Sequence, residues 1–95
     1  MATMVIKHKV ADYNKWKPVF DEHEKVRREY GWTTHSLHRD VENPNLVVVI
    51  GRVKDINRAK EFTRSESLKA AMMKAGVQGT PEIWFLNDAE DDKHY

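Results

Sequence analysis

The sequence predicts an α+β protein built on one four-stranded antiparallel sheet, and two features of the chain lead to this prediction. Residues 46–50 (LVVVI) form an unbroken apolar run rich in β-branched side chains, which is typical of a strand buried on both faces. Strand-like and helix-like patterns alternate on either side of this run, without a linker or a low-complexity segment. The 95 residues are therefore expected to form a single domain.

The chain before the apolar run reads as a strand, a helix and a second strand. Residues 4–10 alternate apolar and polar side chains, as a strand with one buried face does. Asp12 is placed to cap a turn before a helix whose first regular position is Pro18 and whose end is Gly31. Residues 33–40 are polar on both sides, which suits a strand at the edge of a sheet.

The second half of the chain repeats this outline. The turn residues at 42–45 (ENPN) predict a hairpin that leads into the buried strand. Asp55 and Ser65 are placed to cap two successive helical segments, and Gly76 is placed to end the second one. Residues 81–86 are then expected to form a last strand that is apolar on both faces.

The resulting order is β-α-β-β-α-β, which predicts a ferredoxin-like sheet. Right-handed crossovers place the first and third strands at its centre and the second and fourth at its edges. Both helical regions then cover one face, so alternate residues of 46–50 and 83–86 are left on an open apolar face. We therefore expect a homodimer joined through this sheet face, with Lys7 and Lys9 at its rim. The domain is predicted to span residues 1–87, followed by a solvated acidic tail at 88–95.

Composition removes several classes of function. The net charge is +1, and this balance points to neither nucleic acid nor a membrane as a partner. The chain has no cysteine, so disulfides and thiolate chemistry are excluded. Its first residues lack the basic and apolar regions of a signal peptide, which leads us to expect a cytoplasmic protein.

Several short motifs resemble those of a known family. They are HKVxDYxxWKxxFDxH at 8–23, FxxSxxL at 62–68, GV at 76–77 and PEI at 81–83. With them, residues 4–87 resemble the dimeric α/β-barrel proteins of the antibiotic-biosynthesis-monooxygenase-like superfamily, many of which are loosely called cyclases. The resemblance implies dimerisation into an α/β barrel and a ligand pocket between the helices and the sheet of each protomer.

The same resemblance leaves the activity open. The superfamily includes cofactor-free monooxygenases, haem-degrading enzymes, aldoxime dehydratases, isomerases and proteins without known activity. Its haem-degrading members hold haem through a histidine in the second helical region. Residues 55–76 contain no histidine, so we predict neither a haem-degrading role nor any cofactor.

Histidines are the first candidates for chemistry, because the 95 residues include five of them. His8 is expected to share the helix-facing side of the first strand with Ile6, and His23 follows Phe20 by one helical turn, so we assign these two histidines as catalytic. A neutral imidazole can take a proton from an acidic carbon or a phenol, or bind a metal. Their spacing matches no compact metal motif, and no metal is predicted. The alternative is that both are packed core histidines.

A second set of side chains is assigned to ligand binding, although each could instead be ordinary core. It comprises Trp16, Phe20, His38, Trp84 and Met72. His35 replaces His38 if the second strand has the opposite register. Arg27 and Arg28, with Lys25 nearby, are expected to form a solvated helix face rather than an anion site.

Three functions remain open from the sequence. The first is a cofactor-independent monooxygenase or cyclase-like enzyme that acts on an aromatic or polyketide-like substrate with a histidine base. The second is a non-catalytic dimer that binds a small molecule or a metal. The third is a structural or stress-related dimer whose pocket is filled by its own side chains.

Overall fold

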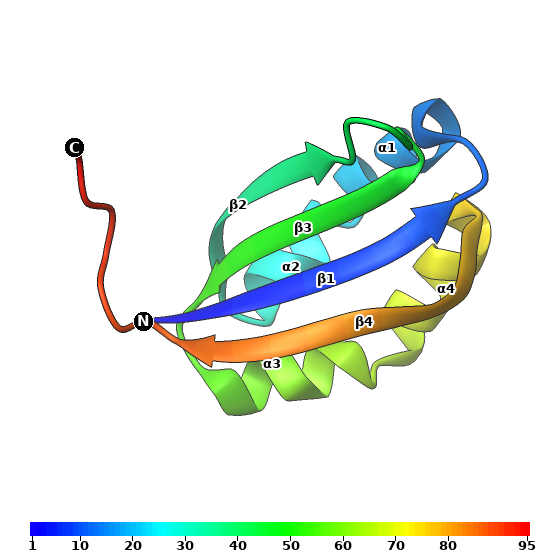
Figure 1. Ribbon diagram of the computed structural model, residues 1–95. Coiled ribbons are helices and arrows are strands. Elements are labelled where there is room, and N and C mark those ends of the chain that lie inside the picture. The colour runs from blue at the N-terminus through cyan, green and yellow to red at the C-terminus, as the bar shows by residue number, and fades with distance from the viewer.

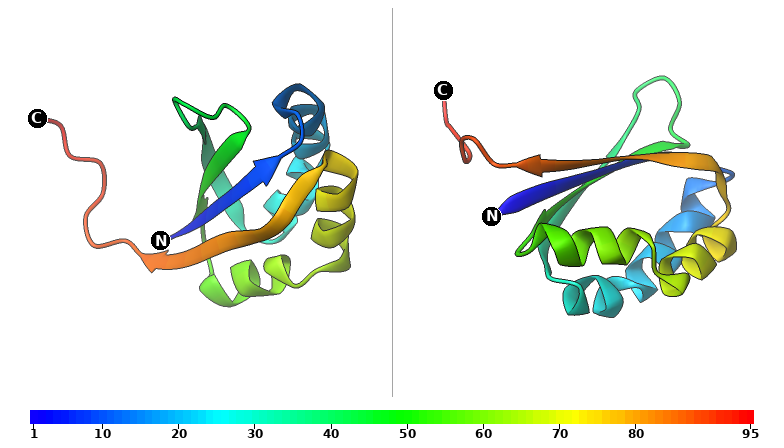
Figure 2. Two further views of the ribbon diagram at one scale, coloured as in Figure 1. Left: turned by 45° about the vertical axis from the view of Figure 1, so that its right-hand side comes forward. Right: turned by 90° about the horizontal axis from the view of Figure 1, so that it is seen from below.

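The computed structural model describes residues 1–95 and confirms the α+β ferredoxin-like fold (Figure 1). Its elements are β1 (Ala2–Val10), α1 (Tyr13–Glu22), α2 (Glu24–Glu29), β2 (Trp32–Arg39), β3 (Leu46–Val53), α3 (Ile56–Thr63), α4 (Glu66–Ala75) and β4 (Val77–Asn87). The strands lie in the order β2-β3-β1-β4 with antiparallel neighbours, so β1 and β3 are central as predicted. All four helices cover one face of the sheet, and the other face carries none (Figure 2). No helix is long and apolar enough to cross a membrane.

The predicted helix caps are confirmed. The side chain of Asp12 accepts a hydrogen bond from the backbone N–H of Asn14 at 2.9 Å, and Asp55 accepts one from Asn57 at 2.8 Å. The hydroxyl of Ser65 accepts one from the N–H of Leu68 at 3.1 Å. Each of these caps satisfies a backbone donor that would otherwise lack a partner at the start of a helix.

The first helical region differs from the prediction. Its first helix begins at Tyr13, directly after the Asp12 cap, so Pro18 lies inside α1 and not at its first position. The region is also broken at His23, whose N–H is shared between the carbonyls of Val19 and Phe20 at 3.2 Å each. Because proline has no N–H and crowds the preceding turn, Pro18 weakens α1 at residues 14–18, before the break. The break places His23 at a corner between α1 and α2.

The core lies between the helices and one face of the sheet. On β3, Val47, Val49 and Val53 are fully buried against the helices, whereas Val48 and Ile50 are only half-buried on the opposite face. The prediction of a strand buried on both faces is therefore confirmed for one face of the isolated chain. A chain of this size supplies only one layer of helices, so the second face has no cover of its own.

Strand pairing decides which side chains face the helices. On β2, His35 is opposite Gly51 and His38 is opposite Val48, which puts His35 on the helix side and His38 on the open face. Between β1 and β4 the pairing shifts, because Lys7 is opposite Glu82 whereas Lys9 is opposite Gln78. This irregularity, a β-bulge in β4, lies beside His8 and leaves that residue without a paired partner on β4.

The acidic tail is not solvated throughout. Two of its carboxylates, those of Asp88 and Asp91, each lie 2.9 Å from the guanidinium of Arg52, and the hydroxyl of Thr3 donates to Asp88. These contacts hold the start of the tail beside the ends of β1 and β3, while the final residues extend away from the body (Figure 1).

Candidate functional site

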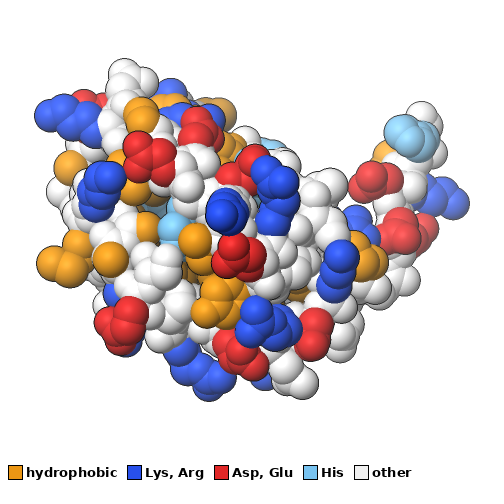
Figure 3. Space-filling view, turned by 180° about the vertical axis from the view of Figure 1, so that it is seen from behind, with side chains coloured by type: hydrophobic (Ala, Val, Ile, Leu, Met, Phe, Trp, Pro, Cys, Tyr) orange, Lys and Arg blue, Asp and Glu red, His pale blue; other side chains and the backbone are white.

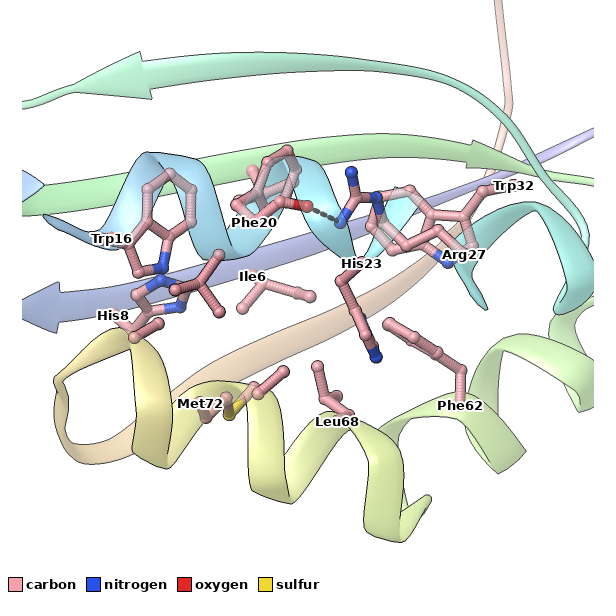
Figure 4. Close-up of a pocket in the computed structure, with 14 residues that line it drawn as sticks. Ile6, His8, Trp16, Phe20, His23, Arg27, Trp32, Phe62, Leu68 and Met72 are labelled. Carbon is pink, nitrogen blue, oxygen red and sulfur yellow. Dashed lines mark hydrogen bonds between the residues drawn. The ribbon is translucent and has the colours of Figure 1, made fainter. Parts of the chain in front are cut away.

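A cavity lies between the helices and the sheet, where the family resemblance implied a ligand pocket. Its free volume is about 40 Å³, and 11 of its 14 lining residues are hydrophobic. That volume is room for about two or three water molecules and not for a ring system. The apolar wall includes Ile6 and Val49 from the sheet and Trp16, Phe20, Phe62, Leu68 and Met72 from the helices (Figure 4). On the helix side of the molecule, histidine atoms are visible among hydrophobic side chains in a hollow of the surface (Figure 3).

His8 is a polar side chain in the wall of this cavity. Its alternation with Ile6 and Val10 on β1 turns it towards the helices, and the residue is only 7% exposed. Neither Nδ1 nor Nε2 has a hydrogen-bond partner, and the nearest ring is that of Trp16, with its centroid 5.6 Å away. Burial lowers the pKa of His8 from 6.5 to about 4. The imidazole is therefore neutral at pH 7.

His23 lies on the helix side of the same cavity. The corner between α1 and α2 turns its ring towards α4, where Nε2 lies 2.8 Å from the hydroxyl of Ser67, and its centroid is 5.8 Å from that of Phe62. Burial and then the positive charge of Arg27 lower the pKa of His23. Two histidines that the sequence assigned to catalysis thus line one cavity, both with a preference for the neutral form.

Arg27 is a site residue that the sequence analysis placed wrongly. It is only 3% exposed and lines the cavity, whereas a solvated position was expected. Its guanidinium lies 3.7 Å from the ring centroid of Phe20, and Nη1 donates a hydrogen bond to the Phe20 carbonyl at 2.7 Å. Burial lowers the pKa of Arg27 to about 10, so it stays charged at pH 7. Its position one turn after His23 was the available signal.

The other assigned residues divide into two groups. The cavity brings together His8, His23, Trp16, Phe20 and Met72. The placement of His38 in the same pocket was wrong, because the register of β2 turns it to the open face, where Nε2 lies 2.9 Å from the hydroxyl of Ser36. Trp84 likewise lies on the open face and is 43% exposed, since its neighbours on β4 take the helix-facing positions. The structure puts His35 on the helix side instead, edge-on to Phe20 with centroids 5.1 Å apart.

A second, polar hollow of about 280 Å³ lies between α2 and β2. Its lining is Glu24, Arg27, Arg28, Trp32, Thr33, Thr34 and His35. Arg27 and Trp32 line both this hollow and the inner cavity, so they form the partition between the two. No group of three or more histidine, aspartate or glutamate side chains is arranged to hold a metal ion.

Comparison with solved structures identifies the fold. SnoaB, a cofactor-independent oxygenase from Streptomyces nogalater, matches with a TM-score of 0.75 at 16% identity, over 94% of this chain and 93% of SnoaB. A candidate antibiotic biosynthesis monooxygenase from Bordetella bronchiseptica gives a TM-score of 0.76 at 12% identity, over 94% of this chain and 97% of that protein. A candidate antibiotic biosynthesis monooxygenase from Caulobacter crescentus gives a TM-score of 0.72 at 23% identity, over 94% of this chain and 90% of that protein.

These similarities show that the chain has the fold of antibiotic biosynthesis monooxygenase-like proteins, as the sequence resemblance implied. No protein-family model and no curated protein matches the sequence. At such low identity, a shared fold does not carry residue roles from one protein to another. A function for this chain therefore has to be argued from its own cavity.

Proposed function

We propose that this protein is a cofactor-independent monooxygenase-like enzyme, in which His8 is the base that removes a proton from an enolisable or phenolic substrate. The observation that carries the proposal is the imidazole of His8, unpaired within the chain, in the wall of a predominantly apolar cavity. A buried polar group without a partner costs about 1–3 kcal/mol of stability. An apolar side chain at this position would pack better, so the imidazole is explained by a ligand that completes its hydrogen bonds.

The chemistry needs only O₂ as co-reactant. Neutral His8 takes a proton from a CH₂ group next to a carbonyl, and the resulting carbanion gives one electron to O₂. The radical pair combines into a peroxide anion, which recovers the proton from the imidazolium. Loss of water then leaves C=O in place of CH₂, so the substrate supplies four electrons, one oxygen atom stays in the product and the other leaves as water.

The resting pKa of about 4 would make His8 a weak base in the empty cavity. A ligand changes this, because the enolate that forms on proton transfer lies beside the imidazolium, and an opposite charge favours the protonated form. His23, already held by Ser67, is suited to orient the ligand or to relay the proton to the surface. Trp16 and Phe20, with centroids 4.8 Å apart, offer a flat apolar wall to a ring.

The small volume of the cavity favours a second candidate, a non-catalytic dimer whose pocket is filled by its own side chains. A ring system can enter only if the cavity widens beyond its present volume of about 40 Å³. Met72, half-buried on α4, is the side chain best able to move, because its three rotatable bonds let it adopt other rotamers at low cost. Binding of a ring compound therefore separates the two candidates.

We also propose that the working form is a homodimer joined through the open sheet face. Trp84 and Leu86 of β4 are 43% and 44% exposed there, and Val5 of β1 lies between Trp84 and the half-buried Ile50 of β3. A contiguous apolar face of this kind is a liability in a monomer. Lys7 and Glu82 on the same face lie 4.0 Å apart and pair with each other, which lowers the cost of covering them.

Anthrone, a tricyclic ketone with one enolisable CH₂ group, is a suitable probe of the activity. We expect oxygen uptake and quinone formation with the wild-type protein, and a loss of about 10²–10⁴-fold in His8→Gln. His38→Gln is the matched control, because His38 lies on the opposite face of the sheet. Equal rates in the two variants would contradict the role of His8. Absence of both binding and turnover in the wild type would favour the filled, non-catalytic dimer.

A further inference from the structure

Two buried hydrogen-bond donors without partners in the chain belong to residues at the end of the cavity away from His8. They are Nη2 of Arg27 and Nε1 of Trp32, in side chains of residues that are only 3% and 5% exposed. The guanidinium carbon lies 5.9 Å from the Trp32 ring centroid. Figure 4 shows Arg27 and Trp32 side by side at one end of the cavity and His8 with Trp16 at the other. A buried donor without a partner in the chain indicates a missing acceptor.

The charge of Arg27 has no counter-ion within the chain. The two carboxylates that act on its charge, those of Glu24 and Asp21, are in direct contact with other cations, since Glu24 pairs with Arg28 at 2.8 Å and Asp21 with Lys17 at 2.7 Å. The Phe20 carbonyl, in the last turn of α1, offers only the partial negative charge of a helix C-terminus. A buried charge without a full partner costs several kcal/mol, and an anion would offset that cost.

We propose that Arg27 and Trp32 form an oxyanion subsite, and that the cavity therefore takes a small organic anion with a carboxylate, phenolate or enolate oxygen. This inference deepens the proposed function and rests on the same cavity being a ligand site. The negative oxygen would accept a hydrogen bond from Arg27 Nη2 and lie beside the Trp32 indole, and the apolar body of the ligand would occupy the inner cavity. The polar hollow on the other side of Arg27 provides the route by which a charged group reaches the subsite.

Both donors are held in place before any ligand arrives. The Trp32 ring packs on Gly51, where even a single methyl group would overlap three ring atoms. Arg27 is fixed by its hydrogen bond to the Phe20 carbonyl and by its stacking on the Phe20 ring. Donors fixed in advance stabilise a developing oxyanion without having to reorganise. The two ends of the ligand are thereby distinguished, with the oxyanion at Arg27 and proton transfer at His8.

Benzoate and its neutral analogue benzamide test the subsite in the intact protein. Titration is followed by NMR through the indole N–H signal of Trp32, which is identified by its loss in Trp32→Phe. We expect benzoate to shift this signal and to bind about tenfold or more tightly than benzamide, which is the range for a hydrogen bond to a charged group. 4-Nitrophenolate in place of benzoate tells a phenolate preference from a carboxylate preference.

Arginine variants complete the test. Arg27→Met should lower benzoate affinity by about tenfold or more and leave benzamide affinity unchanged. Lys25→Gln removes the same charge from an exposed position of the same helix and should change neither. Should Arg27→Met fail to fold, Arg27→Lys and Trp32→Phe each remove part of the donor pair and should give the same direction of change.

The outcomes separate this inference from the proposed function. If benzoate and benzamide bind equally and Arg27→Met affects neither, the oxyanion subsite is wrong while the cavity remains a ligand site. If Lys25→Gln weakens benzoate binding as much as Arg27→Met, the effect is general electrostatics, and the subsite is again wrong. If no ring compound binds, the subsite fails together with the ligand-binding cavity itself.

Discussion

Acid should unfold this protein because His8 must stay neutral inside the core. In the unfolded chain His8 has an ordinary pKa of 6.5, and burial lowers it to about 4 in the folded state. The unfolded state therefore binds the proton more readily, and the free energy of unfolding falls as the pH is lowered from 6.5 towards 4. At 1.36 kcal/mol for each pH unit, the loss attributable to His8 is about 3 kcal/mol.

Urea denaturation between pH 7 and pH 4, followed by tryptophan fluorescence, measures this loss. Wild type and His8→Gln are compared at one protein concentration, since a dimer would make the midpoint depend on concentration. The loss on acidification should be smaller in His8→Gln by about 3 kcal/mol. His23 and His35, whose pKa values are also lowered by burial, contribute with the same sign in both proteins.

His38→Gln is the control for this experiment, because it makes the same substitution at an exposed position outside the cavity. If His8→Gln and the wild type lose the same stability between pH 7 and pH 4, His8 is not held neutral by the fold. The proposal that it serves as a base would then lose its physical ground.

Three further predictions concern the open sheet face, the contact of Trp32 with Gly51, and the absence of a coloured cofactor. Val48→Asp, on the open face, should dissociate the dimer in sedimentation equilibrium, while circular dichroism should show that the monomer stays folded. Val49→Asp, on the helix side, should instead unfold the core. A wild-type protein that is monomeric at micromolar concentration would overturn the proposed dimer. Gly51→Ala should lower the free energy of unfolding by about 1–3 kcal/mol and displace the Trp32 ring, which should change the tryptophan fluorescence spectrum. An unchanged spectrum would contradict the close packing of Trp32 on Gly51. The purified protein should be colourless, and a Soret or flavin band that survives dialysis would refute the expected absence of cofactor.

Local patterns were sufficient for most of the fold. The caps at Asp12, Asp55 and Ser65 were predictable because each depends on a hydrogen bond within three residues along the chain. The central position of β3 was predictable because its apolar run differs so clearly from the polar β2. The break at His23 was not, since no glycine or proline marks it in the sequence.

The site was predictable only where hydrophobic alternation fixed a face. His8 shares β1 with Met4 and Ile6, which are buried, so its direction could be read from the sequence. His38 could not be placed, because residues 33–40 are mostly polar on both sides of the strand and no apolar alternation marks the helix-facing side. Arg27 was missed because a charged side chain is normally solvated, and only its stacking on Phe20 shows otherwise.

The pairing of β1 with β4 has a consequence for synthesis of the chain. Ala2 lies opposite Asn87, so the first and last strands are neighbours in the sheet although almost the whole sequence separates them. On the ribosome, β1 can pair with β3 but has an unpaired edge until β4 emerges, and α4 has no complete sheet to cover. Folding should therefore be completed only after β4 has left the ribosome, in one late and cooperative step. Nascent chains stalled before residue 77 are the species most prone to associate through their free strand edges.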